Sequence, residues 1–274
     1  MKKLSLLFAL LVGIILLMGL KPINKIQWMT LDDGLYYAEY DSPVKSITGD
    51  SKINILKINP ATYKLNLFTE KENGWVRRTA PQWAGYKNQV AIINAGMFMG
   101  DRRSCGYMKN FGEINNSHVS ENNCVLAFNP MGKDIPTVQI IDRQCQEWNA
   151  LRYRYQCFDQ SIRMVDCNQV NVWKDVDKMW SVVTIAMDKD GNVLFIFCRS
   201  PYRMHDFIDI LLNAPIDLYN MMYLEGGPLA SFYLNCNGKQ VKGIGSYESD
   251  FYESNGNNHF WTIPNVIGIE RIVK

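Results

Sequence analysis

The stretch Tyr223-Leu-Glu-Gly-Gly-Pro-Leu-Ala-Ser-Phe-Tyr-Leu234 is the segment around which we expect the fold to be organised. Met221 to Leu224 is apolar and typical of a strand, and it ends abruptly in Glu225 and two glycines. A strand end holds a side chain rigidly, while glycine lets a ligand approach the backbone. The stretch therefore predicts a functional carboxylate at a strand end, with a tight turn and a solvated glutamate as the alternative.

A second apolar strand ends in the same way. Val90-Ala-Ile-Ile-Asn-Ala-Gly-Met-Phe98 runs into Asn94 and Gly96. An asparagine there offers an amide donor and a carbonyl acceptor to a ligand, but asparagine also caps ordinary turns, so both interpretations stay open. The adjacent Arg102 and Arg103 follow, and such a pair either holds a phosphate or carboxylate or forms a solvated surface.

Length, composition and charge narrow the classes of protein. The chain has 274 residues and is 47% hydrophobic, enough to bury a sizeable core. Its 29 Lys and Arg against 27 Asp and Glu leave a net charge of +2, and no long basic run is interleaved with aromatic residues. We therefore expect no nucleic-acid partner.

The N-terminus carries a targeting pattern. Met1-Lys2-Lys3 precedes an uncharged, mostly apolar run over residues 4–20, which indicates an export signal or a membrane anchor. No small-residue cleavage site or lipobox cysteine follows, so we favour slightly an uncleaved anchor and expect an exported protein of the cell envelope. The predicted organisation is a signal or anchor over 1–22, N-terminal strands and a linker over 23–59, and the main domain over 60–274.

Seven cysteines in an exported chain predict disulfides, with at least one thiol left over. Cys198 closes an apolar run and is expected to be a buried free thiol. Candidate local pairs are Cys105 with Cys124 and Cys145 with Cys157, although the sequence leaves the connectivity open. There is no CxxC pair and the three histidines are scattered, so we expect neither a metal site nor a cofactor.

The pattern of elements predicts a single α+β domain with a central mixed, largely antiparallel sheet and a few packing helices. The clearest unit is a hairpin, in which two apolar strands flank the turn 188–192; a calcium loop would also need a downstream glutamate. Apolar periodicity predicts a helix over 205–213, and further helices are expected within 75–86 and 144–154. Short strands are expected at 34–40, 53–56, 63–68, 124–128, 138–141 and 266–272.

These motifs, in this order over roughly residues 60 to 272, resemble the phosphodiester glycosidase family, the family of the uncovering-enzyme domain, and its bacterial branch in particular. Ile93-Asn-Ala-Gly-Met-Phe98 is similar to the family's first corner, and Gly106 stands where the family has a glycine after a short loop. Gln160-Ser161 is similar to its Gln-Ser step, with Ile162-Arg163 in place of the usual Gly-Pro. Tyr223 to Gly227 and Ser231 resemble its second corner.

The resemblance implies hydrolysis of a sugar-1-phosphate diester at the sugar carbon, releasing free sugar and a phosphomonoester. For such chemistry we expect Glu225 to stabilise an oxocarbenium-like state or to activate water, with Asp206 as a candidate second carboxylate. The residues expected to contact the glycan phosphodiester substrate, with Arg103 and Arg199 at its phosphate, are Asn94, Gly96, Phe98, Arg103, Gly106, Arg199, Gly226, Gly227 and Ser231. Glu225 stands where the family usually has aspartate, and Pro228 follows the glycines where a small flexible residue is common.

Two other classes stay open. One is a catalytically silent, exported glycan-binding or cell-envelope protein on the same fold, since an aromatic content of 12% suits sugar stacking as well as core packing. The other is a cysteine hydrolase, which needs a thiol beside a base, although no cysteine neighbours a histidine in the sequence.

Overall fold

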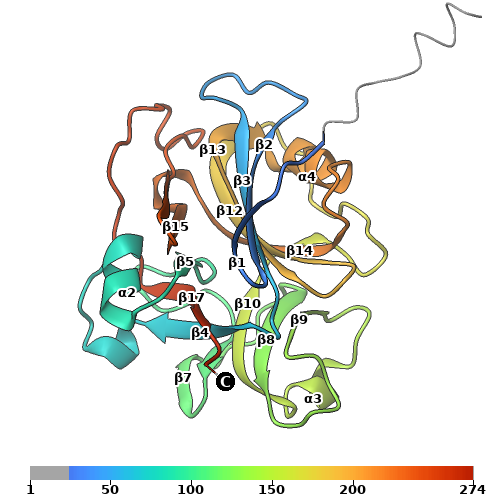
Figure 1. Cartoon of the computed structure of the whole chain (residues 1–274). Helices are drawn as coiled ribbons and strands as arrows, with labels where there is room; N and C mark the ends of the chain where they lie inside the picture. The colour runs from blue at the N-terminus through green and yellow to red at the C-terminus, as the bar shows by residue number, and fades with distance from the viewer. Residues whose placement is uncertain (1–24, 274) are drawn as a thin grey trace, which may run out of the picture.

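The computed structural model describes residues 25–273 (Figure 1). The predicted signal or anchor over residues 1–22 lies outside this range. Within residues 25–273, no helix combines the length and the apolar character needed to cross a membrane. As expected, the chain folds as an α+β unit in which antiparallel strands predominate.

The largest sheet has seven antiparallel strands in the order β1-β2-β3-β13-β12-β14-β11. They are β1 (Met29–Asp32), β2 (Leu35–Asp41), β3 (Lys52–Ile58), β11 (Arg163–Val165), β12 (Met179–Asp188), β13 (Val193–Arg203) and β14 (Leu218–Gly226). The predicted hairpin is confirmed, with Met187 opposite Val193. Its turn forms because the Asp188 carboxylate accepts the backbone N–H groups of Asp190 and Asn192.

Two five-stranded sheets complete the fold, in the orders β7-β6-β10-β8-β9 and β16-β15-β5-β17-β4. The first contains β6 (Met108–Asn110), β7 (Glu113–Asn116), β8 (Cys124–Pro130), β9 (Val138–Asp142) and β10 (Tyr155–Ser161). The second contains β4 (Tyr63–Thr69), β5 (Ala91–Asn94), β15 (Ser231–Cys236), β16 (Lys239–Ile244) and β17 (Asn265–Arg271). Two 3-10 turns, η1 (Lys71–Asn73) and η2 (Gly227–Leu229), follow β4 and β14.

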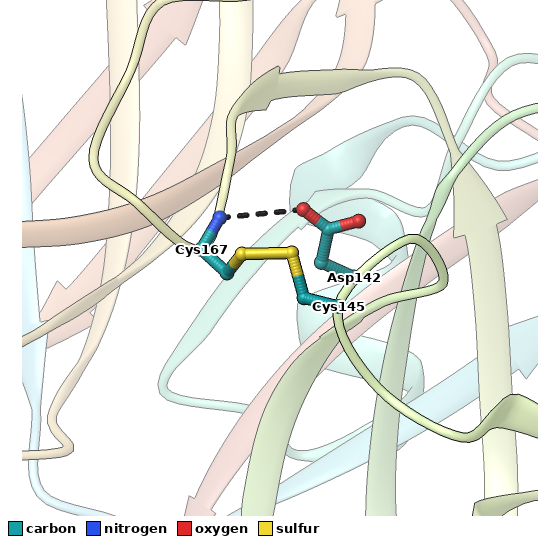
Figure 2. A group of neighbouring side chains, drawn as sticks. All are labelled: Asp142, Cys145 and Cys167. Atoms are coloured by element: carbon teal, nitrogen blue, oxygen red, sulfur yellow. Dashed lines mark hydrogen bonds between the residues drawn. A yellow bond between two sulfur atoms is a disulfide. The ribbon is translucent and has the colours of Figure 1, made fainter.

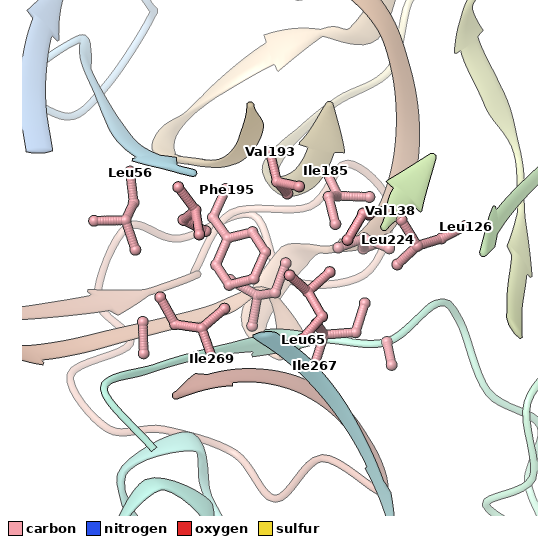
Figure 3. Close-up of a cluster of buried hydrophobic side chains, with 14 of the residues drawn as sticks. Leu56, Leu65, Leu126, Val138, Ile185, Val193, Phe195, Leu224, Ile267 and Ile269 are labelled. Carbon is pink, nitrogen blue, oxygen red and sulfur yellow. The ribbon is translucent and has the colours of Figure 1, made fainter. Parts of the chain in front are cut away.

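The main hydrophobic core lies where the three sheets meet (Figure 3). Each sheet contributes alternate residues of its strands, because successive side chains of a strand point to opposite faces. Leu56 and Phe195 come from the seven-stranded sheet, Leu126 from the sheet that contains β10, and Leu65 and Ile267 from the sheet that contains β5. Burying apolar side chains from all three sheets in one cluster fixes the sheets against one another.

Helices cover the outer faces of the sheets. The amphipathic helix α4 (Met204–Leu212) confirms the helix predicted over 205–213 and packs its apolar face on the seven-stranded sheet. Helix α2 (Ala80–Lys87) lies on the sheet that contains β5 and begins next to Pro81, at a Thr79 capping box. The helix predicted over 144–154 is reduced to α3 (Trp148–Leu151), because Cys145 and Gln146 are held by other contacts.

The single disulfide within residues 25–273 joins Cys145 to Cys167, so the predicted Cys145–Cys157 and Cys105–Cys124 pairs are wrong (Figure 2). Cys157 lies in the middle of β10 and points into the core, where the bridge cannot reach it. Cys198 is a buried free thiol, as predicted. Asp142 lies beside the two bridged sulfurs, but the bond consumes the thiolates that a metal ion would need.

The disulfide holds the connection between two sheets. Cys145 follows β9, whereas Cys167 follows β11, the edge strand that pairs with β14. The Asp142 carboxylate accepts the Cys167 backbone N–H and forms a 2.8 Å ion pair with Arg163. These contacts hold β11 against the end of β9, beside β14, the strand that carries Glu225.

Candidate active site

Glu225 lies at the end of β14, where a β-bulge redirects its side chain. Val183 of β12 lies opposite Glu225 and Thr184 lies opposite Tyr223, so Leu224 is an extra residue on β14. Directly opposite residues share a face, and Val183 belongs to the core between the sheets. The bulge therefore points the Glu225 carboxyl inward, where the residue retains only 9% exposure.

Gly226 and Gly227 occupy places where a side chain would clash. A Cβ at Gly226 would lie 2.4 Å from the Tyr223 hydroxyl and 2.6 Å from Cδ1 of Trp180. Gly227 has a φ of +59°, and a Cβ there would lie 2.2 Å from Oε2 of Glu248. The glycine pair is thus required by steric contact and by left-handed backbone, and it brings a second carboxylate next to the corner.

We expect Gly226→Ala to lower both stability and activity, because neither the Tyr223 ring nor the Trp180 indole can move aside freely. Overpacking of this kind typically costs about 1–3 kcal/mol. Thermal unfolding followed by circular dichroism measures the effect. The matched control is Gly85→Ala in α2, where no atom beyond the neighbouring residues and the backbone of the helix itself lies within 4 Å of the added methyl group. Equal stability of the two variants would contradict the steric argument.

Asn94 ties the two glycine corners together. Its Oδ1 accepts the backbone N–H of Ser231 at 2.8 Å, and its Nδ2 donates to the carbonyl of Leu229 at 3.1 Å. The Ser231 hydroxyl also donates to the Leu229 carbonyl. The carbonyl oxygen and the NH₂ group of the buried Asn94 side chain are therefore both used in holding η2 and the start of β15 against the end of β5.

Asp159 is a buried carboxyl group beside Gly96 that the sequence analysis did not single out. It lies near the end of β10 and is fully buried, and a Cβ at Gly96 would lie 2.9 Å from its Oδ1. Within residues 25–273, neither of its carboxyl oxygens has a hydrogen-bond partner. Burial without compensation raises the pKa of Asp159 to about 7. Gly96, at a φ of +61°, leaves room for this carboxyl group.

The loop that begins at Gly96, beside Asp159, brings Cys105 near Glu225. The backbone N–H of Cys105 donates to the carbonyl of Met97 at 2.9 Å, which folds the loop back on itself. Cys105 is a half-buried free thiol. Burial raises its pKa, and the Glu225 carboxyl group, once ionised at high pH, raises it further. A thiol in such surroundings is a poor thiolate nucleophile, which disfavours the cysteine-hydrolase interpretation.

The surroundings of Glu225 favour the neutral form of its carboxyl group. Removal from water raises the pKa of Glu225 to about 8, and the charge of Glu248 acts in the same direction, against one hydrogen bond from the Gly226 N–H. Glu248 is less buried, and its pKa is raised chiefly by the same loss of solvent. The corner therefore holds two carboxyl groups in unlike surroundings, an arrangement typical of acid and base pairs.

Three aromatic rings adjoin the Glu225 corner. The ring centres of Trp173 and Tyr223 are 5.4 Å apart, and those of Trp173 and Trp180 are 6.4 Å apart. Trp173 and Trp180 are only partly buried. Rings of this kind stack on the apolar faces of sugars as readily as on one another.

Two of the predicted site residues pair with side chains other than Glu225. Asp206 lies in the first turn of α4, and its ion-pair partner is Arg203, at 3.7 Å. Arg103 pairs with Asp101 at 2.7 Å, and about half of each side chain is exposed. Both remain predictions as site residues.

The other predicted residues have structural contacts. Phe98 lies under the guanidinium of Arg102, which forms a 2.5 Å ion pair with the buried Glu70. A Cβ at Gly106 would lie 2.4 Å from the carbonyl oxygen of Gln160, so this glycine lets the loop approach β10. Arg199 donates to three backbone carbonyls in and beyond β16.

Comparison with known proteins agrees with this architecture. The sequence matches the family model described as phosphodiester glycosidase over residues 87–270, and the chain therefore belongs to the phosphodiester glycosidase family. None of the curated proteins matches the sequence.

Solved structures share the fold at low identity. The zebrafish N-acetylglucosamine-1-phosphodiester alpha-N-acetylglucosaminidase catalytic domain, auto-inhibited by its pro-peptide, is 14% identical with a TM-score of 0.60, over 89% of this chain and 87% of that one. A hypothetical protein from Synechocystis is 13% identical with a TM-score of 0.56, over 89% and 63%. A candidate exported protein from Burkholderia pseudomallei is 8% identical with a TM-score of 0.51, over 80% and 73%.

Proposed function

We propose that this protein is an exported glycosidase that cleaves a sugar-1-phosphodiester to free sugar and a phosphomonoester. The observation that carries the proposal is the Glu225 carboxyl group, held neutral by burial at a glycine corner beside Glu248, in a member of this family. A neutral carboxyl group donates a hydrogen bond to an anionic phosphate, whereas an ionised one would repel it.

The reaction needs one proton donor and one proton acceptor. We assign the donor to Glu225, whose proton passes to the phosphate oxygen as the bond from that oxygen to the anomeric carbon breaks. A water oxygen bonds to the same carbon, and its proton passes to the Glu248 carboxylate, which also stabilises the positive charge that develops on the sugar. Because phosphate is a weakly basic leaving group, modest protonation is sufficient.

These roles refine those expected from the sequence. Burial favours Glu225 as an acid below pH 8, in place of a base that activates water. Glu248 takes the role of second carboxylate in preference to Asp206, because it contacts the glycine corner while Asp206 is half exposed and pairs with Arg203. Arg103, whose guanidinium is half exposed, stays our candidate for a phosphate contact.

The remaining residues position the substrate. The backbone amides near Gly96 and at Gly226 and Gly227 orient the sugar, while Asn94 and Ser231 hold the two corners at a fixed separation. Asp159, which is fully enclosed, supports the Gly96 loop and does not touch the reacting atoms. Small displacements of such a frame are costly to catalysis.

A glycan-binding protein without activity is the second candidate. The aromatic rings of Trp173, Trp180 and Tyr223 beside the corner favour sugar binding whether or not hydrolysis follows. Pro228, the second departure from the family's corner, lies buried within η2.

The test is hydrolysis of a panel of sugar-1-phosphodiesters, including a GlcNAc-1-phosphodiester, in water enriched in ¹⁸O. Our proposal expects free sugar and a phosphomonoester, with the label at the anomeric carbon. Label in the phosphate would instead show cleavage of a phosphorus–oxygen bond and would overturn the glycosidase assignment. Sugar binding without turnover across the panel would favour the silent glycan-binding protein.

A further inference from the structure

A basic groove runs along the edge strand β16, and Arg199 is the one residue of its lining that the sequence analysis assigns to substrate contact. It has a volume of about 600 Å³ and lies between β16 and the strands β2, β3 and β13. The residues of the groove that bear on its ligand are Tyr37, Lys52, Arg199, Lys239, Lys242 and Asn257.

The charge of this groove, called here the β16 groove, favours an anion. Its lining has four cationic side chains and two carboxylates, Glu39 and Asp50. Lys52 is paired with Glu39 at 2.5 Å. The Lys239 ammonium lies 4.8 Å from the ring centre of Tyr37, and within residues 25–273 neither Lys239 nor Lys242 has a carboxylate within ion-pair distance. Two cations are thus available to a ligand.

Arg199 and Asn257 give the groove a rigid polar floor. Three of the five N–H donors of the Arg199 guanidinium bond to the carbonyls of Ile244, Asn255 and Asn257, which fixes its position. Asn257 is 3% exposed, and its Oδ1 has no hydrogen-bond partner within residues 25–273. A sugar hydroxyl is a suitable donor to such an oxygen.

The groove adjoins the Glu225 corner. Ile244, which lines the groove, precedes Gly245, and the backbone N–H of Gly245 donates to the carbonyl of Ala230 at 2.8 Å. A Cβ at Gly245 would lie 2.1 Å from the carbonyl oxygen of Gly227. Ile244 in the groove is therefore followed directly by Gly245, which packs against Gly227 beside Glu225.

We infer that the β16 groove binds a further anionic unit of the substrate, so that the substrate class is a glycan whose sugars are joined through several phosphodiesters. This inference rests on the proposed function. Lys239, Lys242 and Arg199 hold a phosphate of the flanking unit, and Asn257 accepts a hydroxyl of its sugar.

The kinetic test compares a tetramer of GlcNAc-1-phosphate units with a single GlcNAc-1-phosphodiester. We expect Lys239→Gln/Lys242→Gln to lower kcat/KM for the tetramer roughly tenfold, chiefly through KM, which corresponds to losing one charge-assisted hydrogen bond. Turnover of the single phosphodiester is expected to stay within about twofold. The matched control is Lys133→Gln/Lys189→Gln, which removes two exposed charges elsewhere. Equal losses on both substrates, or no loss on the tetramer, would overturn the inference.

A binding measurement separates this inference from the proposed function. The probe is a heparin hexasaccharide, an acidic saccharide without phosphodiesters, titrated calorimetrically into the otherwise unaltered protein. We expect binding that weakens with salt and is lost in Lys239→Gln/Lys242→Gln but kept in the control variant. If the hexasaccharide binds in this way but no sugar-1-phosphodiester is hydrolysed, anion binding by the groove is supported and the proposed glycosidase activity is rejected. If the protein hydrolyses the phosphodiester but the double variant binds the hexasaccharide as the parent does, the proposed activity is supported and the inferred role of the groove is rejected.

Discussion

Glu225→Gln is expected to reduce kcat for the sugar-1-phosphodiester by about a hundredfold to ten-thousandfold, the range typical of a lost general acid. The amide is similar in size to the neutral carboxyl group that it replaces, so the fold should survive. It has no proton to give to the leaving phosphate oxygen. Free-sugar release under saturating substrate measures the loss, and circular dichroism verifies the fold.

The pH dependence of the same variant identifies the role. Glu225 acts while protonated, and its pKa is raised to about 8, so we expect kcat/KM of the parent protein to fall as the pH rises through 8. Glu225→Gln should lack that descending limb. Glu253→Gln, which alters an exposed carboxylate near Glu248, is the matched control. A parent activity that rises through pH 8 would assign Glu225 to the base instead.

The second carboxylate can be identified by the same assay. A large loss in Glu248→Gln with little change in Asp206→Asn would support the assignment made from the glycine corner. The opposite result would return the role to Asp206, the candidate named in the sequence analysis.

Asp159→Asn is expected to stabilise the protein at high pH relative to low pH. The pKa of Asp159 is raised from 3.8 to about 7, so its contribution to stability is present below about pH 4 and is lost as the pH rises to 7. Between pH 5 and pH 8 this loss amounts to roughly 2–3 kcal/mol, at about 1.4 kcal/mol for each pH unit. Asparagine carries no charge at either pH, so the variant avoids this loss of stability. Urea unfolding at the two pH values measures the difference.

Ser161→Ala is the control for Asp159→Asn, since it changes a neighbouring buried side chain without altering an ionisable group. Its effect on stability should be the same at pH 5 and pH 8. If the free energy of unfolding of Asp159→Asn differs from that of the parent by the same amount at both pH values, then Asp159 is not a buried acid of raised pKa.

The sequence predicted the two corners because each signal is local. An apolar strand that ends in a polar residue and glycine is visible in a few letters, and both Asn94 and Glu225 lie at such ends. The hairpin at 188–192 and the helix α4 were predictable for the same reason. The two corners are joined by the hydrogen bonds between Asn94 and residues Leu229 and Ser231. Which segments meet in this way depends on the order of the strands in the sheet, and neither stretch of sequence shows that order.

Asp159 and Glu248 were missed because their importance depends on what packs against them. Asp159 shares a strand face with Cys157, and alternation along β10 was the one signal that could have indicated an inward carboxyl group. Glu248 lies in a loop, and only the space left by Gly227 shows its place. Arg199 is a related case, because three N–H donors of its guanidinium bond to backbone carbonyls from distant segments, and no local stretch of sequence indicates those partners.

The bond from Asn94 to Ser231 and the contact of Glu248 with Gly227 also bear on when the protein becomes competent during synthesis. The first corner emerges from the ribosome early, but it has no partner until β15 has followed, and the acid of β14 lacks its companion carboxylate until residue 248 has been added. A nascent chain that ends before that point is expected to be inert towards sugar phosphates, so the order of residues along the chain delays activity until nearly all of the domain has been made.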